Sequence, residues 1–290
     1  MHPLIQQLLA QGPVITDGAW GTQLQERGLS LGEFPDTWNL THADKVAEVA
    51  RAYVQAGSQV ILTNTFGANR IRLGDHAAAG AVSEINRRGV EISRAAAAGR
   101  ARVFASMGPT GKLLMNGDVT RDAMGDAFAE QARALAKGGA DALVVETMSD
   151  LDEAVLAIAA ALETGLPVVA CMVFDSGKDK DRTMMGATPE QAARTLTQAG
   201  ADVIGANCGQ GIAGFVAIAP RLRAATERPL WLKPNAGLPA MVEGRPQYST
   251  APEEFAGYVP KLVELGAAFV GGCCGARPDF ITAIRRQLNR

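Results

Sequence analysis

Short apolar runs alternate with longer amphipathic stretches along the whole chain. The runs are rich in β-branched residues and too short for helices, so they predict strands buried in a parallel sheet. The predicted strands are residues 14–16, 60–63, 103–106, 142–146, 168–174, 203–206, 230–233 and 268–271. Between them, apolar positions recur at helical spacing. The predicted helices are residues 43–56, 78–98, 121–137, 150–163, 189–199, 212–225, 252–265 and 279–288, after a short N-terminal helix within residues 1–12.

A recurrent glycine phrase joins several predicted helices to the next strand. It reads Ala56-Gly57-Ser58, Gly138-Gly139-Ala140-Asp141, Ala199-Gly200-Ala201-Asp202 and, in a shorter version, Leu265-Gly266-Ala267. A glycine just past a helix end supplies the left-handed cap, after which the chain enters a strand at once. Eight strands, each followed by a helix, favour a (β/α)8 TIM barrel over an open doubly wound sheet. With no linker or low-complexity segment, we expect one α/β domain over residues 1–290.

Composition narrows the class of protein. The chain has 290 residues, 47% of them hydrophobic, and a formal net charge of −2 without a basic face, so nucleic acid is an unfavoured partner. The apolar stretches are too short to span a membrane, and the N-terminus lacks the charged region of a signal peptide. Only four cysteines in a chain this long favour reduced thiols in the cytoplasm. The sequence leaves the oligomeric state open.

The cysteines carry the strongest chemical signal. Cys273 and Cys274 are adjacent and flanked by glycines, and Cys208 follows another short apolar run. Core packing poorly explains two neighbouring cysteines, because strand neighbours point to opposite faces, and a disulfide is disfavoured in a reducing compartment. Three thiolates on one Zn²⁺ leave the fourth tetrahedral position open, as in catalytic sites. Cys171 lies inside an apolar strand and is interpreted as a small core hydrophobe.

Polar residues gather at the carboxyl ends of the predicted strands, which share one face of a barrel where active sites form. They are Asp17, Asn64, Ser106, Glu146, Asn207, Cys208, Asn235, Cys273 and Cys274. Asp17 either accepts a hydrogen bond from a substrate ammonium or hydroxyl group, or caps the next segment. Glu146 ends an apolar run, where an unpaired carboxylate is costly, so it needs a substrate amino group or a structural salt bridge.

Other motifs offer no rival site. His2, His42 and His76 form neither HExxH nor a pair at helical spacing. The segment from Ser106 to Lys112 departs from the phosphate-loop pattern, which requires a glycine at position 106 and Ser or Thr after the lysine. No GxGxxG follows the first strand, so nucleotide binding is disfavoured.

The chain resembles the zinc-dependent homocysteine S-methyltransferases, which include the homocysteine-binding module of cobalamin-dependent methionine synthase and the betaine–homocysteine methyltransferases. The matching segments are Asp17-Gly18-Ala19-Trp20-Gly21-Thr22, Trp38-Asn39-Leu40-Thr41, Thr63-Asn64-Thr65-Phe66-Gly67-Ala68-Asn69, Gly108-Pro109-Thr110-Gly111, Glu146-Thr147, Asn207-Cys208, Pro234-Asn235-Ala236-Gly237 and Gly271-Gly272-Cys273-Cys274-Gly275. The resemblance implies a (β/α)8 barrel with Zn²⁺ on Cys208, Cys273 and Cys274.

The same resemblance implies the roles of the other candidate site residues. Asp17 and Glu146 match positions that bind the homocysteine amino group, and Asn235 lies in the Pro-Asn-Ala-Gly segment beside the metal. Lys233 departs from the acidic residue often found in that segment.

The expected reaction is methyl transfer to the thiolate of homocysteine, giving methionine without a general base, because Zn²⁺ removes the thiol proton. These 290 residues leave no room for a folate or corrinoid module. We therefore expect either a small onium donor, betaine or S-methylmethionine, or methylcobalamin presented by a separate corrinoid protein. The alternatives are another thiol or selenol acceptor and a non-catalytic zinc-binding barrel. The second is disfavoured, because structural zinc normally has four protein ligands. A thiol redox enzyme is disfavoured by the lack of CxxC.

Overall fold

Eight parallel strands form a nearly closed barrel in the computed structural model, which describes residues 1–30, 32–74, 77–242 and 245–289. Their order around the barrel is β1-β10-β7-β6-β5-β4-β3-β2. The strands are β1 (Val14–Ile15), β2 (Val60–Ile61), β3 (Arg102–Met107), β4 (Ala142–Met148), β5 (Val168–Met172), β6 (Val203–Gly211), β7 (Leu230–Asn235) and β10 (Ala267–Val270). The first and last strands in this order also meet, since the backbone N–H of Gln59 donates to the carbonyl of Ile15 over 2.7 Å.

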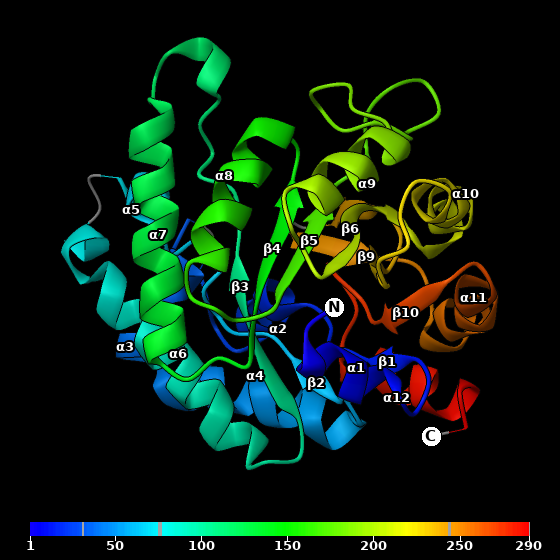
Figure 1. Ribbon diagram of the computed structural model, residues 1–290. Helices are drawn as coiled ribbons and strands as arrows, with labels where there is room; N and C mark the ends of the chain where they lie inside the picture. The colour runs from blue at the N-terminus through cyan, green and yellow to red at the C-terminus, as the bar shows by residue number, and fades with distance from the viewer. Residues whose placement is uncertain (31, 75–76, 243–244, 290) are drawn as a thin grey trace.

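Helices surround the strands, as Figure 1 shows. They are α1 (Pro3–Leu9), α2 (Trp20–Glu26), α3 (Trp38–Thr41), α4 (Ala43–Ala56), α5 (Arg70–Leu73), α6 (Val82–Ala97), α7 (Arg121–Lys137), α8 (Leu151–Leu162), α9 (Pro189–Gln198), α10 (Ile212–Arg223), α11 (Pro252–Glu264) and α12 (Pro278–Gln287). The predicted glycine stop is visible after α4, where Gly57 has a φ of +108°. No helix in the described ranges is long and apolar enough to cross a membrane.

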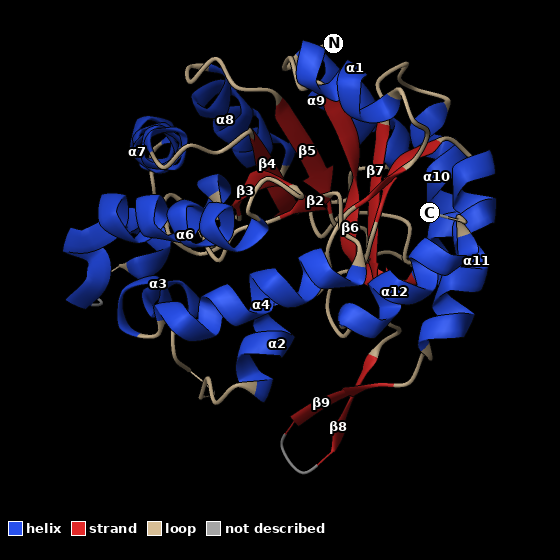
Figure 2. Ribbon diagram, turned by 90° about the horizontal axis from the view of Figure 1, so that it is seen from below, coloured by secondary structure: helices blue, strands red, loops and turns tan. Residues whose placement is uncertain are grey.

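Two apolar cores hold the barrel together. The larger lies between the strands and the helices that cover them. The smaller fills the barrel interior, where Trp231 packs against both Phe104 and Phe269. Ile5 of α1 joins this inner core, so the N-terminal helix covers one end of the barrel. Figure 2 shows α1 and the β8–β9 hairpin at opposite ends, which leaves the carboxyl ends of the strands on the hairpin side.

The predicted order of strands and helices is confirmed, with shifts at the ends. Strands β4 and β6 run past their predicted limits, whereas β5 ends at Met172 and α6 begins at Val82 after a 3-10 turn. His76 lies outside the described residues. The sequence did not predict the short helices α2, α3 and α5, nor the antiparallel hairpin of β8 (Pro239–Val242) and β9 (Arg245–Tyr248). Both hairpin strands contain a proline, which weakens any strand signal.

Candidate metal and substrate site

Three cysteine sulfurs converge at the carboxyl end of the barrel. The Sγ atoms of Cys208, Cys273 and Cys274 all lie within 4.8 Å of one another, and those of Cys208 and Cys274 are 3.9 Å apart. A tetrahedral Zn–S distance of about 2.3 Å places neighbouring sulfurs about 3.8 Å apart. The cluster therefore fits a thiolate-bound metal such as Zn²⁺. Among the described residues, this is the one group of three or more Cys, His, Asp or Glu side chains with such spacing.

Irregular backbone aims the three sulfurs at one point. Cys208 has a φ of +60°, and the register between β6 and β7 shifts between Cys208 and Gly211. Bulges and left-handed non-glycine residues cluster at functional sites, where they redirect a side chain. Cys273 and Cys274 lie beyond the last residue of β10, so the alternation of a strand no longer separates their side chains. This position explains how two adjacent cysteines serve one cluster.

Asn235 and Asn207 hold the cysteine segments in place. The Asn235 side chain donates to the carbonyl of Gly209 and accepts from the backbone N–H of Cys274, both over 3.0 Å. It thus joins the segment of Cys208 to that of Cys274. The Asn207 side-chain amide lies 3.9 Å from Cys273 Sγ and donates to Glu146 over 3.2 Å.

A cavity of about 460 Å³ opens directly over the sulfurs. Part of its wall comes from the strand ends and contains the three cysteines, Ser106, Glu146 and Lys233. The rest comes from the segments after β1 and β2. It includes three aromatic side chains, Trp20, Phe34 and Phe66, and three charged ones, Glu33, Asp36 and Arg72. The cavity therefore combines a sulfur-rich region with an aromatic and charged region, enough to hold a thiol beside a second small molecule.

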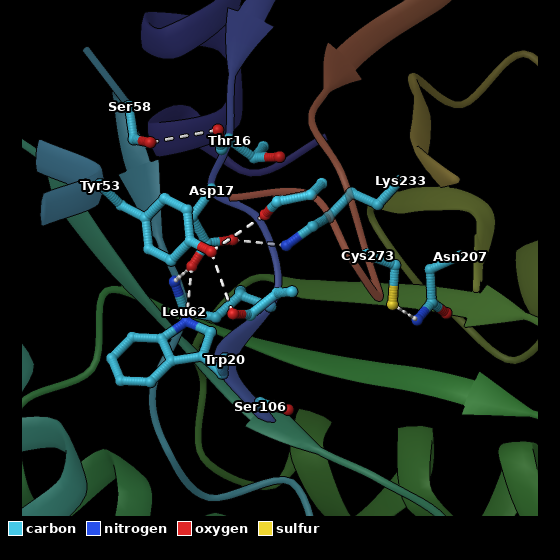
Figure 3. A network of polar contacts seen from close by, with 12 residues as sticks. Thr16, Asp17, Trp20, Tyr53, Ser58, Leu62, Ser106, Asn207, Lys233 and Cys273 are labelled. Atoms are coloured by element: carbon cyan, nitrogen blue, oxygen red, sulfur yellow. Dashed lines mark hydrogen bonds and ion pairs between the residues drawn. The ribbon is translucent and has the colours of Figure 1, made fainter. Parts of the chain in front are cut away.

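A buried charge network lies beside Cys273 (Figure 3). Lys233 Nζ forms an ion pair with Asp17 Oδ1, and both side chains are almost completely buried. Asp17 Oδ2 accepts from Trp20 Nε1 over 2.8 Å and from the Leu62 N–H over 2.7 Å. Burial lowers the pKa of Lys233, but Asp17 and Glu146 outweigh it and raise that pKa. The lysine is therefore a permanent cation of the site.

Glu146 is the carboxylate that lines the sulfur-rich region of the cavity. Its Oε1 accepts a short hydrogen bond from the Ser106 hydroxyl, and its Oε2 accepts from Asn207. Burial raises the pKa of Glu146, while Lys233 and Ser106 partly offset the rise. The residue after it, Thr147, has a φ of +60°, and the register of β4 against β5 shifts between Val145 and Met148. A bulge thus turns Glu146 toward the cavity.

The three thiols also shift one another's pKa values. Contact with Cys208, together with burial, raises the pKa of the Cys273 thiol. Thiols this close resist ionising together unless a cation compensates their charge, which is what a bound metal provides. The ring of Tyr248, at the end of the hairpin, lies against Gly275, the residue after Cys274. The hairpin therefore packs beside the cluster.

The site residues expected from the sequence fall into two groups. Cys208, Cys273, Cys274 and Glu146 line the cavity. Asp17 and Asn235 lie directly behind its wall and hold lining residues through the contacts above. Cys171 is buried in the inner core, as its strand pattern predicted.

The sequence did not predict three contributions to the site. Lys233 is the ion-pair partner of Asp17, and Asn207 links Glu146 to Cys273. The third contribution is the packing of Tyr248 beside the cysteines. The sequence did contain a sign of the ion pair, because a lysine ends the apolar run 230–233 and a buried ammonium needs a carboxylate partner. The other two contacts depend on tertiary structure.

Comparisons with known proteins agree with this geometry. The family model of the homocysteine S-methyltransferases matches residues 14–288. Methionine synthases of Mycobacterium leprae and Mycobacterium tuberculosis are 32% and 33% identical over 98% and 96% of this chain. The chain spans about a quarter of the length of these relatives, 25% in each case.

Solved structures of the Escherichia coli homocysteine methyltransferase MmuM share the fold. Its oxidised form has a TM-score of 0.80 at 23% identity, covering 98% of this chain and 99% of that one. Its metallated form has a TM-score of 0.79 at 24% identity, covering 99% and 100%. The family model covers nearly the whole chain and includes all three cysteines. The chain therefore belongs to the homocysteine S-methyltransferase family.

Proposed function

We propose that this protein transfers a methyl group to the thiolate of homocysteine and thereby forms methionine, at a Zn²⁺ ion held by Cys208, Cys273 and Cys274. The observation that carries the proposal is the convergence of three sulfurs at the wall of a cavity large enough for substrate. Zinc on three thiolates has one open position, where it would ligate the substrate thiol and lower its pKa. The tetrahedral spacing of the sulfurs supports this choice of metal.

The protein's own residues would orient the acceptor. Glu146 faces the cavity beside the cysteines and is placed to pair with the substrate amino group. A direct contact between Asp17 and that group remains a prediction. Asp17 already binds Lys233, Trp20 and Leu62. In the protein without substrate, its carboxylate therefore holds these neighbours in position. Asn235 would fix the cysteine segments rather than touch the substrate.

For the methyl donor we favour a small onium compound such as S-methylmethionine or betaine. The second region of the cavity offers the aromatic rings of Trp20, Phe34 and Phe66 together with the carboxylates of Glu33 and Asp36. Aromatic faces and carboxylates are the groups that bind a sulfonium or quaternary ammonium. Methylcobalamin is the second candidate, because the chain matches a quarter of each methionine synthase. A corrinoid is larger than the cavity and would approach it from outside.

Two other readings remain as alternatives. A related thiol or selenol acceptor would use the same sulfur cluster. A non-catalytic zinc barrel is disfavoured, because the group of ligating side chains found in the described residues has three members rather than four. Since the site depends on reduced thiols, we expect the protein to work in the cytoplasm.

The test is methionine formation from homocysteine with each donor in turn, with metal content measured on the same protein. We expect about one zinc per chain and turnover with an onium donor. The Cys208→Ala variant should lose both zinc and turnover. Cys171→Ala is the matched control, because it removes a buried cysteine outside the cluster. Full turnover by metal-free protein would overturn the proposal, and turnover with protein-bound methylcobalamin alone would replace the onium donor.

A further inference from the structure

Lys233 lines the cavity, and its ion pair with Asp17 does not use all of its hydrogen-bond donors. An ammonium group has three N–H donors, and within the described part of the chain Nζ has one hydrogen-bond partner, Asp17. Lys233 also lines the cavity beside Glu146 and Cys273. The other cavity-lining cation, Arg72, lies 5.7 Å from the centre of the Phe66 ring, in the aromatic region.

We propose that Lys233 and Glu146 together bind the head group of an amino-acid thiol, with the substrate carboxylate on Lys233 and the substrate ammonium on Glu146. This inference rests on the proposed function and makes Lys233 a specificity-determining residue for the acceptor. Asp17 holds Lys233 in place. The cysteines would hold the other end of the same molecule through the metal.

The charges at the site support this assignment. Asp17 is fully buried, and both of its oxygens already accept hydrogen bonds, so it serves as the fixed anchor of the lysine. Lys233 and Glu146 present one positive and one negative charge on the same stretch of cavity wall. A zwitterion matches both charges at once, and charge-assisted contacts gain strength where water is excluded.

The arrangement also predicts which thiols the site rejects. A thiol without a carboxylate leaves the free N–H groups of Lys233 without a partner in a buried place. A thiol without an ammonium leaves the Glu146 carboxylate with its hydrogen bonds from Ser106 and Asn207 but without a cation from the substrate. An unmatched buried charge is costly, so sites built around a polar group discriminate strongly against analogues that lack it.

The experiment measures binding of three thiols to the zinc-loaded protein by calorimetry, without methyl donor. The thiols are L-homocysteine, 4-mercaptobutyrate, which lacks the ammonium group, and 3-aminopropane-1-thiol, which lacks the carboxylate. In Lys233→Met we expect affinity for the first two to fall roughly 10- to 100-fold, the range of a hydrogen bond to a charged group, and affinity for the third to be unchanged. In Glu146→Gln the losses should fall on homocysteine and the aminothiol instead.

Two further variants separate this role from a structural one. Lys233→Met leaves Asp17 buried without its cation and can damage the fold. The double variant Asp17→Asn/Lys233→Met removes both charges and should show the same selectivity as Lys233→Met. Lys233→Arg keeps the cation and should retain affinity for 4-mercaptobutyrate better than Lys233→Met does. Equal losses for all three thiols, or none, in the double variant would overturn the inference. If the wild-type protein bound none of the thiols, the proposed function itself would fail.

Discussion

Glu146 and Asp36 are buried carboxylates in the wall of the same cavity, and they differ in how their charge is compensated. Glu146 has Lys233 nearby, together with hydrogen bonds from Ser106 and Asn207. Asp36 accepts from the Gly67 N–H over 2.9 Å, and Arg72 is the cation that acts on it. Burial raises the pKa of Asp36 to about 6. Asp36 therefore carries its charge at neutral pH at a cost in stability.

The pH dependence of that cost can be predicted. Because the folded pKa of Asp36 is above the unfolded one, its favourable contribution is complete below pH 4 and is lost as pH rises through about 6. The Asp36→Asn variant keeps an acceptor for Gly67 but carries no charge. We expect it to be more stable than wild type at pH 7.5, by about 3 kcal/mol at most, from the conversion of about 1.4 kcal/mol per pKa unit.

The measurement is the free energy of unfolding of both proteins by urea titration between pH 3.5 and 8. The difference between them should be near zero at the acid end, grow between pH 4 and 6 and remain constant above. Glu33→Gln is a contrasting control, because Glu33 lines the same cavity but is exposed to solvent. A backbone hydrogen bond from Ser30 lowers the pKa of Glu33, so any pH dependence of this variant has the opposite sign. A difference that stays constant across the whole range would contradict the assignment to Asp36.

At the scale of elements, the β8–β9 hairpin packs beside the cysteine cluster. It follows β7 and returns at Tyr248, whose ring lies against Gly275, next to Cys274. Gly275 has a φ of +80°, and a Cβ there would lie 2.3 Å from the Tyr248 ring. Both the backbone conformation and the close approach therefore require glycine.

We expect Gly275→Ala to push Tyr248 and the hairpin away from Cys274 and to strain the turn that carries both cysteines. The predicted result is a loss of stability of about 1–3 kcal/mol, together with a zinc affinity lowered by about tenfold or more. Zinc affinity is measured by competition with a chromogenic chelator, and stability by urea titration.

Gly257→Ala provides the matched control. It lies within helix α11, and a Cβ there meets no atom within 4 Å. Replacing a helical glycine by alanine should stabilise by about 0.5–1 kcal/mol and leave zinc affinity unchanged. If the two alanine variants bound zinc equally well, the hairpin would have no part in the cluster.

At the scale of the molecule, the proposed metal site forms only when the barrel is closed. Cys208 comes from β6 and the other two cysteines from beyond β10, and the ion pair of Asp17 with Lys233 joins the segment after β1 to β7. Unfolding separates these groups, so a metal bound by all three stabilises the folded state alone. At free zinc 100-fold above its dissociation constant, the linkage is worth about 2.7 kcal/mol.

Zinc removal should therefore lower the thermal midpoint by roughly 5–10 °C under those conditions, at about 2–4 °C per kcal/mol for a chain of this size. The measurement is differential scanning calorimetry of the wild-type protein with zinc and after chelation. The Cys208→Ala variant should show a much smaller shift. A chelator effect of full size in that variant would place the stabilising metal elsewhere.

The sequence by itself determined the order of the strands and helices, the face on which the functional residues gather, and the three cysteines. These features follow from local rules. Periodicity distinguishes strand from helix, glycine stops each helix, and parallel strands place their carboxyl ends on one side. The adjacent Cys273 and Cys274 were informative for the same reason, because a strand cannot direct neighbours to one point.

Only the tertiary structure decided which of those residues reach the cavity and which support them from behind. Asp17 and Lys233 are separated by 216 positions in sequence, and their pairing depends on β1 and β7 both bordering β10. The contact of Tyr248 with Gly275, next to Cys274, depends on a hairpin whose strands hold prolines. Asn207 joins Glu146 to Cys273 across strand ends. Such contacts arise between segments distant in sequence, and no local pattern encodes the geometry that brings them together.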